Sequence, residues 1–256
     1  MSIVTGLLNP KTKTNVGRIV GPNGKSVFAS AGVSTSPTTN TTKSVTTGFQ
    51  PKLVIPFGNL DNQNRSTSSA LFSIGVGSSV TTRSACSLSS VNGVTTSDTV
   101  KHQIATKINS QLTTTGSVLE EADLESLDSS GFTLDWTTTN AAERILNHIA
   151  IGGSGVRATI TQHQMNATNS AQSFAHGLGV TPSALIFISN LSSSPPPETI
   201  GTIKFSIGCW GGSSQFSAAQ YAVDGLTTTN CRRSLSVNSV VSDISTSYRR
   251  TMAVSS

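Results

Sequence analysis

Hydrophobic residues along this chain fall in short runs bounded by Gly and Pro, without the spacing of a long amphipathic helix. The apolar run at residues 53–57 begins just after a proline and is typical of a buried strand. Residues 72–76 and 131–136 alternate apolar with small or polar side chains, so each predicts a strand with one buried face. One short helical pattern covers residues 140–147, and a further strand is predicted at 148–151.

The same anchors occur twice in the same order. Three blocks recur at offsets of 131 to 133 residues: Gly48-x-x-Pro51 returns as Gly179-x-x-Pro182, Phe72-Ser73-Ile74-Gly75 returns as Phe205-Ser206-Ile207-Gly208, and Asn92-Gly93 returns as Asp224-Gly225. Two related units are therefore expected, and each Asn-Gly or Asp-Gly pair predicts a type I′ hairpin turn.

The second unit has no counterpart of the strand predicted at 131–136. A sheet that lacks a strand exposes an edge, and exposed edges invite pairing with another chain. The second unit is thus expected either to be completed by a neighbouring subunit or by the first 43 residues, or simply to be a smaller unit. The sequence leaves both possibilities open.

These patterns predict an all-β protein of two tandem, jelly-roll-like β-sandwich units with an extended N-terminal arm. The expected boundaries are 1–43 for a basic arm, 44–153 for the first unit and 154–256 for the second, shorter unit.

Composition adds a polar surface to this picture. The chain has 42 Ser and 35 Thr among 256 residues, with only 11% charged and 5% aromatic residues. Disorder is not expected, because the net charge is only +5 and the apolar residues are grouped. Faces rich in Ser and Thr suit close packing against neighbours, since little charge or side-chain entropy is lost on burial.

Several features argue against other classes of protein. No stretch approaches the roughly 18 apolar residues of a membrane span, and residues 1–10 lack the pattern of a secretory signal. Cys86, Cys209 and Cys231 are an odd count without metal-ligand spacing, and we interpret them as filler in strands. No cofactor and no membrane partner are expected.

Candidate chemistry is sparse. Residues 21–26 end like a phosphate-binding loop, but Ile19 stands where that loop needs Gly, so a β-turn is favoured. The four histidines do not fall at metal-ligand spacing: His102, His148, His163 and His176. We therefore predict no catalytic, cofactor-binding or metal-binding residues, and no enzymatic activity.

Five carboxylates lie within nine residues: Glu120, Glu121, Asp123, Glu125 and Asp128. Such a cluster could provide the paired acids of a glycoside hydrolase or oxygen ligands for calcium. The interpretation that we favour is a solvated loop that faces a basic neighbour.

Basic residues are concentrated at the start of the chain, where the first 43 residues contain no carboxylate. The predicted partner-docking residues are Lys11, Lys13, Arg18, Lys25, Lys43, Arg249 and Arg250. An acidic protein surface is the favoured partner, and nucleic acid is not expected because the segment has no aromatic platform for stacking bases.

Several of the strand and turn motifs resemble those of a group of tailed-bacteriophage structural proteins. The matching segments are 47–52 (TGFQPK), 72–75 (FSIG), 121–124 (EADL), 128–137 (DSSGFTLDWT) and 149–153 (IAIGG). The resemblance implies a virion building block rather than a reaction.

We therefore expect a non-enzymatic virion protein, most simply an external capsid decoration protein, that forms homo-oligomers and binds other virion proteins through its arm. A tail-fibre or tail-tip component is the first alternative. The second is a lectin-like module that binds host surface glycan through loops of the second unit, which contain Pro195, Pro196 and Pro197, and Trp210, Gly211 and Gly212.

Overall fold

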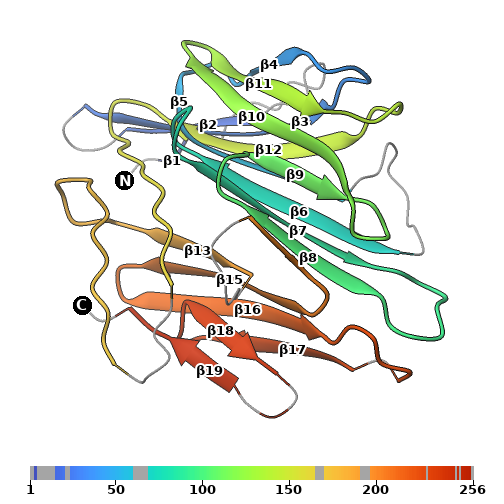
Figure 1. Cartoon of the computed structure of the whole chain (residues 1–256). Coiled ribbons are helices and arrows are strands. Elements are labelled where there is room, and N and C mark those ends of the chain that lie inside the picture. Colours follow the sequence, from blue (N-terminus) through green and yellow to red (C-terminus); the bar gives the residue numbers. More distant parts are fainter. Residues whose placement is uncertain are drawn as a thin grey trace.

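The fold consists of strands in four sheets (Figure 1). The computed structural model describes residues 3–4, 15–20, 24–59, 69–164, 170–190, 197–228, 230–245, 247 and 249–254. Every regular element in these ranges is a strand, so the prediction of an all-β protein is confirmed. Within the same ranges, no helix is long and apolar enough to cross a membrane.

The largest sheet, sheet A, has nine strands and joins both predicted units. Its strands are, in spatial order, β1 (Ile3–Val4), β2 (Asn15–Val20), β3 (Ser26–Thr35), β12 (Ile145–Gly152), β5 (Pro51–Gly58), β6 (Ala70–Gly77), β7 (Arg83–Ser90), β8 (Thr99–Ile104) and β14 (Glu198–Ile200). The strands expected at 53–57, 72–76 and 148–151 are β5, β6 and β12.

Three smaller sheets complete the fold. Sheet B contains β4 (Thr42–Thr46), β11 (Gly131–Thr138), β10 (Val118–Asp128) and β9 (Asn109–Leu112). Sheet C contains β13 (Leu185–Ser189), β15 (Ile203–Gly211), β16 (Ser214–Ala222) and β17 (Cys231–Ser236). Sheet D is the pair β18 (Val241–Ile244) and β19 (Arg249–Met252).

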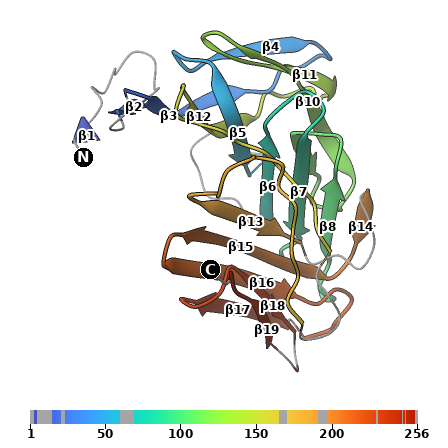
Figure 2. The same cartoon turned by 90° about the vertical axis from the view of Figure 1, so that its left-hand side faces the viewer.

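Sheet A packs between sheets B and C, which lie above and below it in Figure 2. Sheet D packs on the other face of sheet C, where Ile244 of β18 meets Ala219 and Tyr221 of β16. Between sheets B and A lies a core that includes Phe132, Leu134 and Trp136, the three residues expected to point inward from β11. Sheet C covers the opposite face of sheet A, so the two units share a second core. In that core the rings of Phe72 and Phe205 meet edge to face, with centroids 5.8 Å apart.

The matched sequence anchors occupy matching positions in the two units. A backbone crossing at Ile108 passes so close to β6 that a Cβ on Gly75 would overlap its carbonyl group. Val240 crosses β15 in the same way at Gly208. Glycine is needed at both places because the approaching atoms are backbone and cannot rotate away.

Loops 91–98 and 223–230 also correspond. Each is closed by one backbone hydrogen bond, from Val91 N to Asp98 O (2.9 Å) and from Val223 N to Asn230 O (3.2 Å). Each connects paired strand ends through eight residues, so the two-residue hairpin turns that we expected are wrong. Gly93 nevertheless takes the positive φ (78°) that its turn chemistry favours.

Two expectations about the first unit change. Residues 140–147 do not form the expected helix, because 140–144 are irregular and β12 begins at Ile145. The described part of the expected arm is extended, but it is built into the first sandwich: β3 pairs with β12 over eight residues, and β4 begins at Thr42. The pairing of β12 with β3, which is distant in sequence, therefore decides the structure of residues 145–147 against their helical spacing.

Candidate interaction surface

The acidic segment 120–128 lies in strand β10, not in the solvated loop that we favoured. Its side chains point to different sides of the strand, since Glu120 is fully buried while Glu125 is exposed. Asp123 pairs with Arg83 Nη2 at 3.1 Å and with Lys107 Nζ at 3.3 Å. Among the described residues, no group of three or more His, Cys, Asp or Glu side chains is placed to hold a metal ion.

Glu120 lies in a buried polar cluster at the end of the first core. Its Oε1 accepts a hydrogen bond from Ser36 Oγ at 3.1 Å, and Gln111 lies opposite it on β9. Burial raises the pKa of Glu120 to about 7, although Ser36 and the charge of Arg144 act in the other direction. The cluster therefore keeps a titratable proton near neutral pH inside the sandwich.

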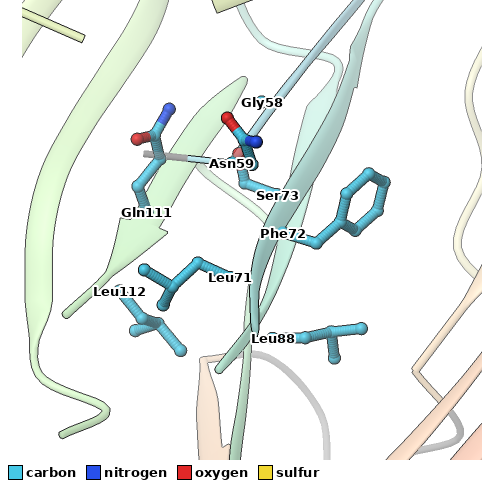
Figure 3. Close-up of a pocket in the computed structure, with 8 residues that line it drawn as sticks. All are labelled: Gly58, Asn59, Leu71, Phe72, Ser73, Leu88, Gln111 and Leu112. Carbon is cyan, nitrogen blue, oxygen red and sulfur yellow. The ribbon is translucent and has the colours of Figure 1, made fainter. Parts of the chain in front are cut away.

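A narrow hollow lies beside this cluster, and Figure 3 shows Gln111, Asn59 and Ser73 around it. It is too narrow at every point to hold a water molecule. The side-chain amide of Gln111 and the hydroxyl of Ser73 are buried without a hydrogen-bond partner among the described residues. The hollow is thus a packing defect, lined by both polar and apolar side chains, rather than a binding pocket.

The histidines lie apart from one another. His148 is buried beside Phe132 at a centroid distance of 5.3 Å, and burial lowers its pKa to about 4. His163 stacks on Phe174, while His176 Nδ1 accepts from the backbone N–H of Leu178. They therefore do not form a shared site.

His102 connects the two units. Its Nδ1 lies 2.7 Å from Thr199 Oγ1, and its Nε2 lies 3.9 Å from Glu121 Oε1. The order hydroxyl, imidazole, carboxylate is that of a nucleophilic triad, but His102 and Thr199 are directly paired residues of β8 and β14. This geometry favours a structural connection between the strands.

Further polar contacts join the units near β8. Lys101 is 1% exposed, and its Nζ donates to the carbonyl oxygen of Asn190 at 2.7 Å. Burial lowers the pKa of Lys101 to about 8 against the raising effect of Glu198. Thr99 N donates to Asp224 Oδ1 at 2.9 Å. The two units are consequently joined by directed hydrogen bonds as well as by an apolar core.

Those predicted docking residues that the structure describes are not gathered into one patch. Lys11 and Lys13 lie outside the described residues; Arg18 is in β2 and Arg249 in β19, with side chains that are not described. Lys25 is exposed before β3, Lys43 Nζ donates to Thr35 Oγ1 at 2.8 Å, and Arg250 is exposed on β19. These positions are spread over sheets A, B and D.

The loops expected to bind glycan are only partly described. Trp210 is half-buried near the end of β15. Gly211, the last residue of β15, and Gly212, in the turn that follows, are both exposed. Pro195 and Pro196 lie outside the described residues, whereas Pro197 is exposed.

Sheet C exposes an apolar row that sequence reasoning missed. Ile186, Cys209 and Phe216 are cross-strand neighbours on β13, β15 and β16, and Leu235 on β17 lies on the same face. Ile186 is 47% exposed, Phe216 52% and Leu235 71%. This face is also the one that packs against sheet A, so the row continues the shared core to the surface.

Strand β13 is an edge of sheet C. It pairs with β15 over five residues without a break in register, and its backbone makes no other pairing with a described strand. This edge is not the one expected from the sequence, because the strand predicted at 131–136 is β11, which pairs with β10 and β4 in sheet B. Together with the apolar row, β13 forms the candidate interaction surface.

A scan against protein-family models matched no family, and no curated protein and no solved structure proved similar to the chain.

Proposed function

We propose that this protein is a non-enzymatic structural component of a tailed-bacteriophage virion, located on the outside of the capsid as a decoration protein. The observation that carries the proposal is the set of strand and turn motifs that resembles phage structural proteins, in particular TGFQPK, FSIG, DSSGFTLDWT and IAIGG.

The places of these motifs support a structural role. Phe49 of the first motif stacks on Phe28 with centroids 5.4 Å apart, and its ring also lies where a Cβ on Gly152 would be. Gly131 of the third motif lies against the backbone of Val45. Each motif thus fixes a contact between strands, and its function is packing rather than chemistry.

The surface supports the same role. Exposed positions of β16 include Ser214 and Ala218, two small residues on the same face of sheet C as Phe216 of the apolar row. Such faces lose little solvation or side-chain entropy when a neighbour covers them. An assembly with many copies in closed symmetry is the expected setting for such a surface.

The experiment is to purify the particles whose genome encodes this chain and to identify their proteins by mass spectrometry. Cryo-electron microscopy of these particles should then show the four-layered fold on the capsid exterior. Particles from a strain with the gene deleted are the matched control and should lack only that density. Absence of the chain from purified particles would overturn the proposal.

Density at the tail would instead favour the first alternative, a tail-fibre or tail-tip component. The second alternative, a lectin-like module, is tested by a glycan array with the full chain. Specific binding that is lost in Trp210→Ala would favour it over a purely structural role.

A further inference from the structure

We propose that β13 pairs antiparallel with β13 of a second copy of this chain, so that two copies of sheet C become one eight-stranded sheet. This inference goes beyond the virion role, because it concerns what the isolated chain does in solution.

The first reason is the chemistry of the edge. Natural sheet edges are usually protected from pairing by charged residues, proline or a bulge. Strand β13 has the sequence LIFIS, with none of these, and its register with β15 is regular. The opposite edge of the same sheet, β17, carries Arg232 and Arg233, both exposed. Only one of the two edges of sheet C is therefore protected.

The second reason comes from the first unit. Strand β5 stands in the matched position to β13, and its outer edge is occupied by β12 in antiparallel pairing. Ile149 of β12 lies directly opposite Ile55 of β5. The residue that matches Ile55 is Ile186, which is 47% exposed. In the first unit the outer edge of β5 is thus covered by β12, whereas the matching edge of β13 in the second unit has no described strand beside it.

The third reason is that the edge is complementary to itself. In a two-fold antiparallel pair centred on Phe187, Ile186 lies opposite Ile188 of the second copy, and Leu185 lies opposite its Ser189. Like charges that face each other are the usual obstacle to pairing identical strands, and this arrangement has none. The apolar row of Ile186, Phe216 and Leu235 would extend on the same face in both copies, continuous with the shared core.

A charge on the edge tests this pairing in the full-length protein. Ile186→Lys places an ammonium group within the new strand pair, so the dissociation constant of the dimer should rise by at least about tenfold. Leu235→Lys is the matched control: its side chain is on the same face and more exposed, but it lies on the protected edge. Sedimentation equilibrium measures both, and circular dichroism confirms that both variants are folded.

A wild-type chain that stays monomeric up to its solubility limit would overturn the proposal, because β13 would then not pair with a second copy. A dimer that Leu235→Lys weakens and Ile186→Lys does not would also overturn it, because the apolar face would then be the interface. Neither result bears on whether the chain is present in virions, so the two proposals fail separately.

A disulfide test fixes the register. Residues directly opposite in an antiparallel pair have Cα atoms about 4.5–5.5 Å apart, which a disulfide can span. The background carries Cys231→Ser, which removes the exposed thiol, and Cys209→Ser, which removes the thiol directly opposite residue 186 on β15. In this background Phe187→Cys should form a covalent dimer on mild oxidation. Ile186→Cys in the same background should not, because the two copies of residue 186 are offset along the strands. Equal cross-linking of both variants would contradict the proposed register.

Discussion

Glu120 offers the sharpest test of the first core. Its carboxylate is fully buried, and its pKa rises from 4.5 to about 7 because burial disfavours the charged form. The folded state therefore holds this proton more tightly than the unfolded state does. Stability contributed by the proton is complete below pH 4.5, is lost as pH rises, and is gone above about pH 7.

The size of the effect follows from the shift. Each pKa unit corresponds to about 1.4 kcal/mol, so the change from 4.5 to about 7 amounts to about 3 kcal/mol. Glu120→Gln keeps the shape of the protonated side chain but cannot ionise. Relative to the wild type, the variant should have similar stability at pH 4 and be about 3 kcal/mol more stable at pH 8.

Urea unfolding from pH 4 to pH 8.5 measures the free energy of unfolding for both proteins. The difference between them isolates Glu120, because every other group titrates alike in the two chains. Glu125→Gln is the control, since it removes an exposed carboxylate from the same strand and should leave the profile parallel to the wild type. A difference between wild type and Glu120→Gln that does not change with pH would refute the reasoning.

Three further predictions concern the fold. Gly75→Ala should lower the free energy of unfolding, measured in urea, by about 3 kcal/mol because the added methyl group meets the backbone of Ile108. An unchanged free energy would show that the backbone at Ile108 can move away. In a double-mutant cycle of Phe72→Leu and Phe205→Leu, the coupling free energy should be about 1 kcal/mol, whereas no coupling would mean that the units do not share this core. Burial raises the pKa of the Cys86 thiol to about 12, so this thiol should react with a disulfide reagent at pH 8 only after unfolding; rapid labelling in the native protein would contradict its burial.

The fold class followed from local pattern because alternation and turn residues are local properties. Strands β5, β6, β11 and β12 all lie where apolar runs or period-two alternation placed them. The segment 140–147 was misread because an irregular stretch and the first residues of a strand together imitate helical spacing. Only the pairing of β12 with β3 and β5, distant in sequence, decides its structure.

The acidic strand shows where sequence patterning fails. In β10 the residues that point inward are Glu120, Ala122 and Leu124. An apolar alternation cannot be recognised in this sequence, because the first inward residue is a carboxylate. Its hydrogen-bond partner is Ser36, which follows β3 and lies 84 residues away in sequence, so no local window includes it. The packing of sheet C on sheet A could not be predicted either, because the sequence of one strand does not determine which sheet covers it.

The contact between Phe72 and Phe205 has an evolutionary consequence. These residues occupy the same position in the two repeats, so that position in the first repeat contacts its own equivalent in the second. A residue meets its own counterpart at the axis of a two-fold homodimer. Gene duplication and fusion of such a homodimer would leave this contact inside one polypeptide, and afterwards each half would be free to diverge, one keeping a full sandwich and the other an open edge.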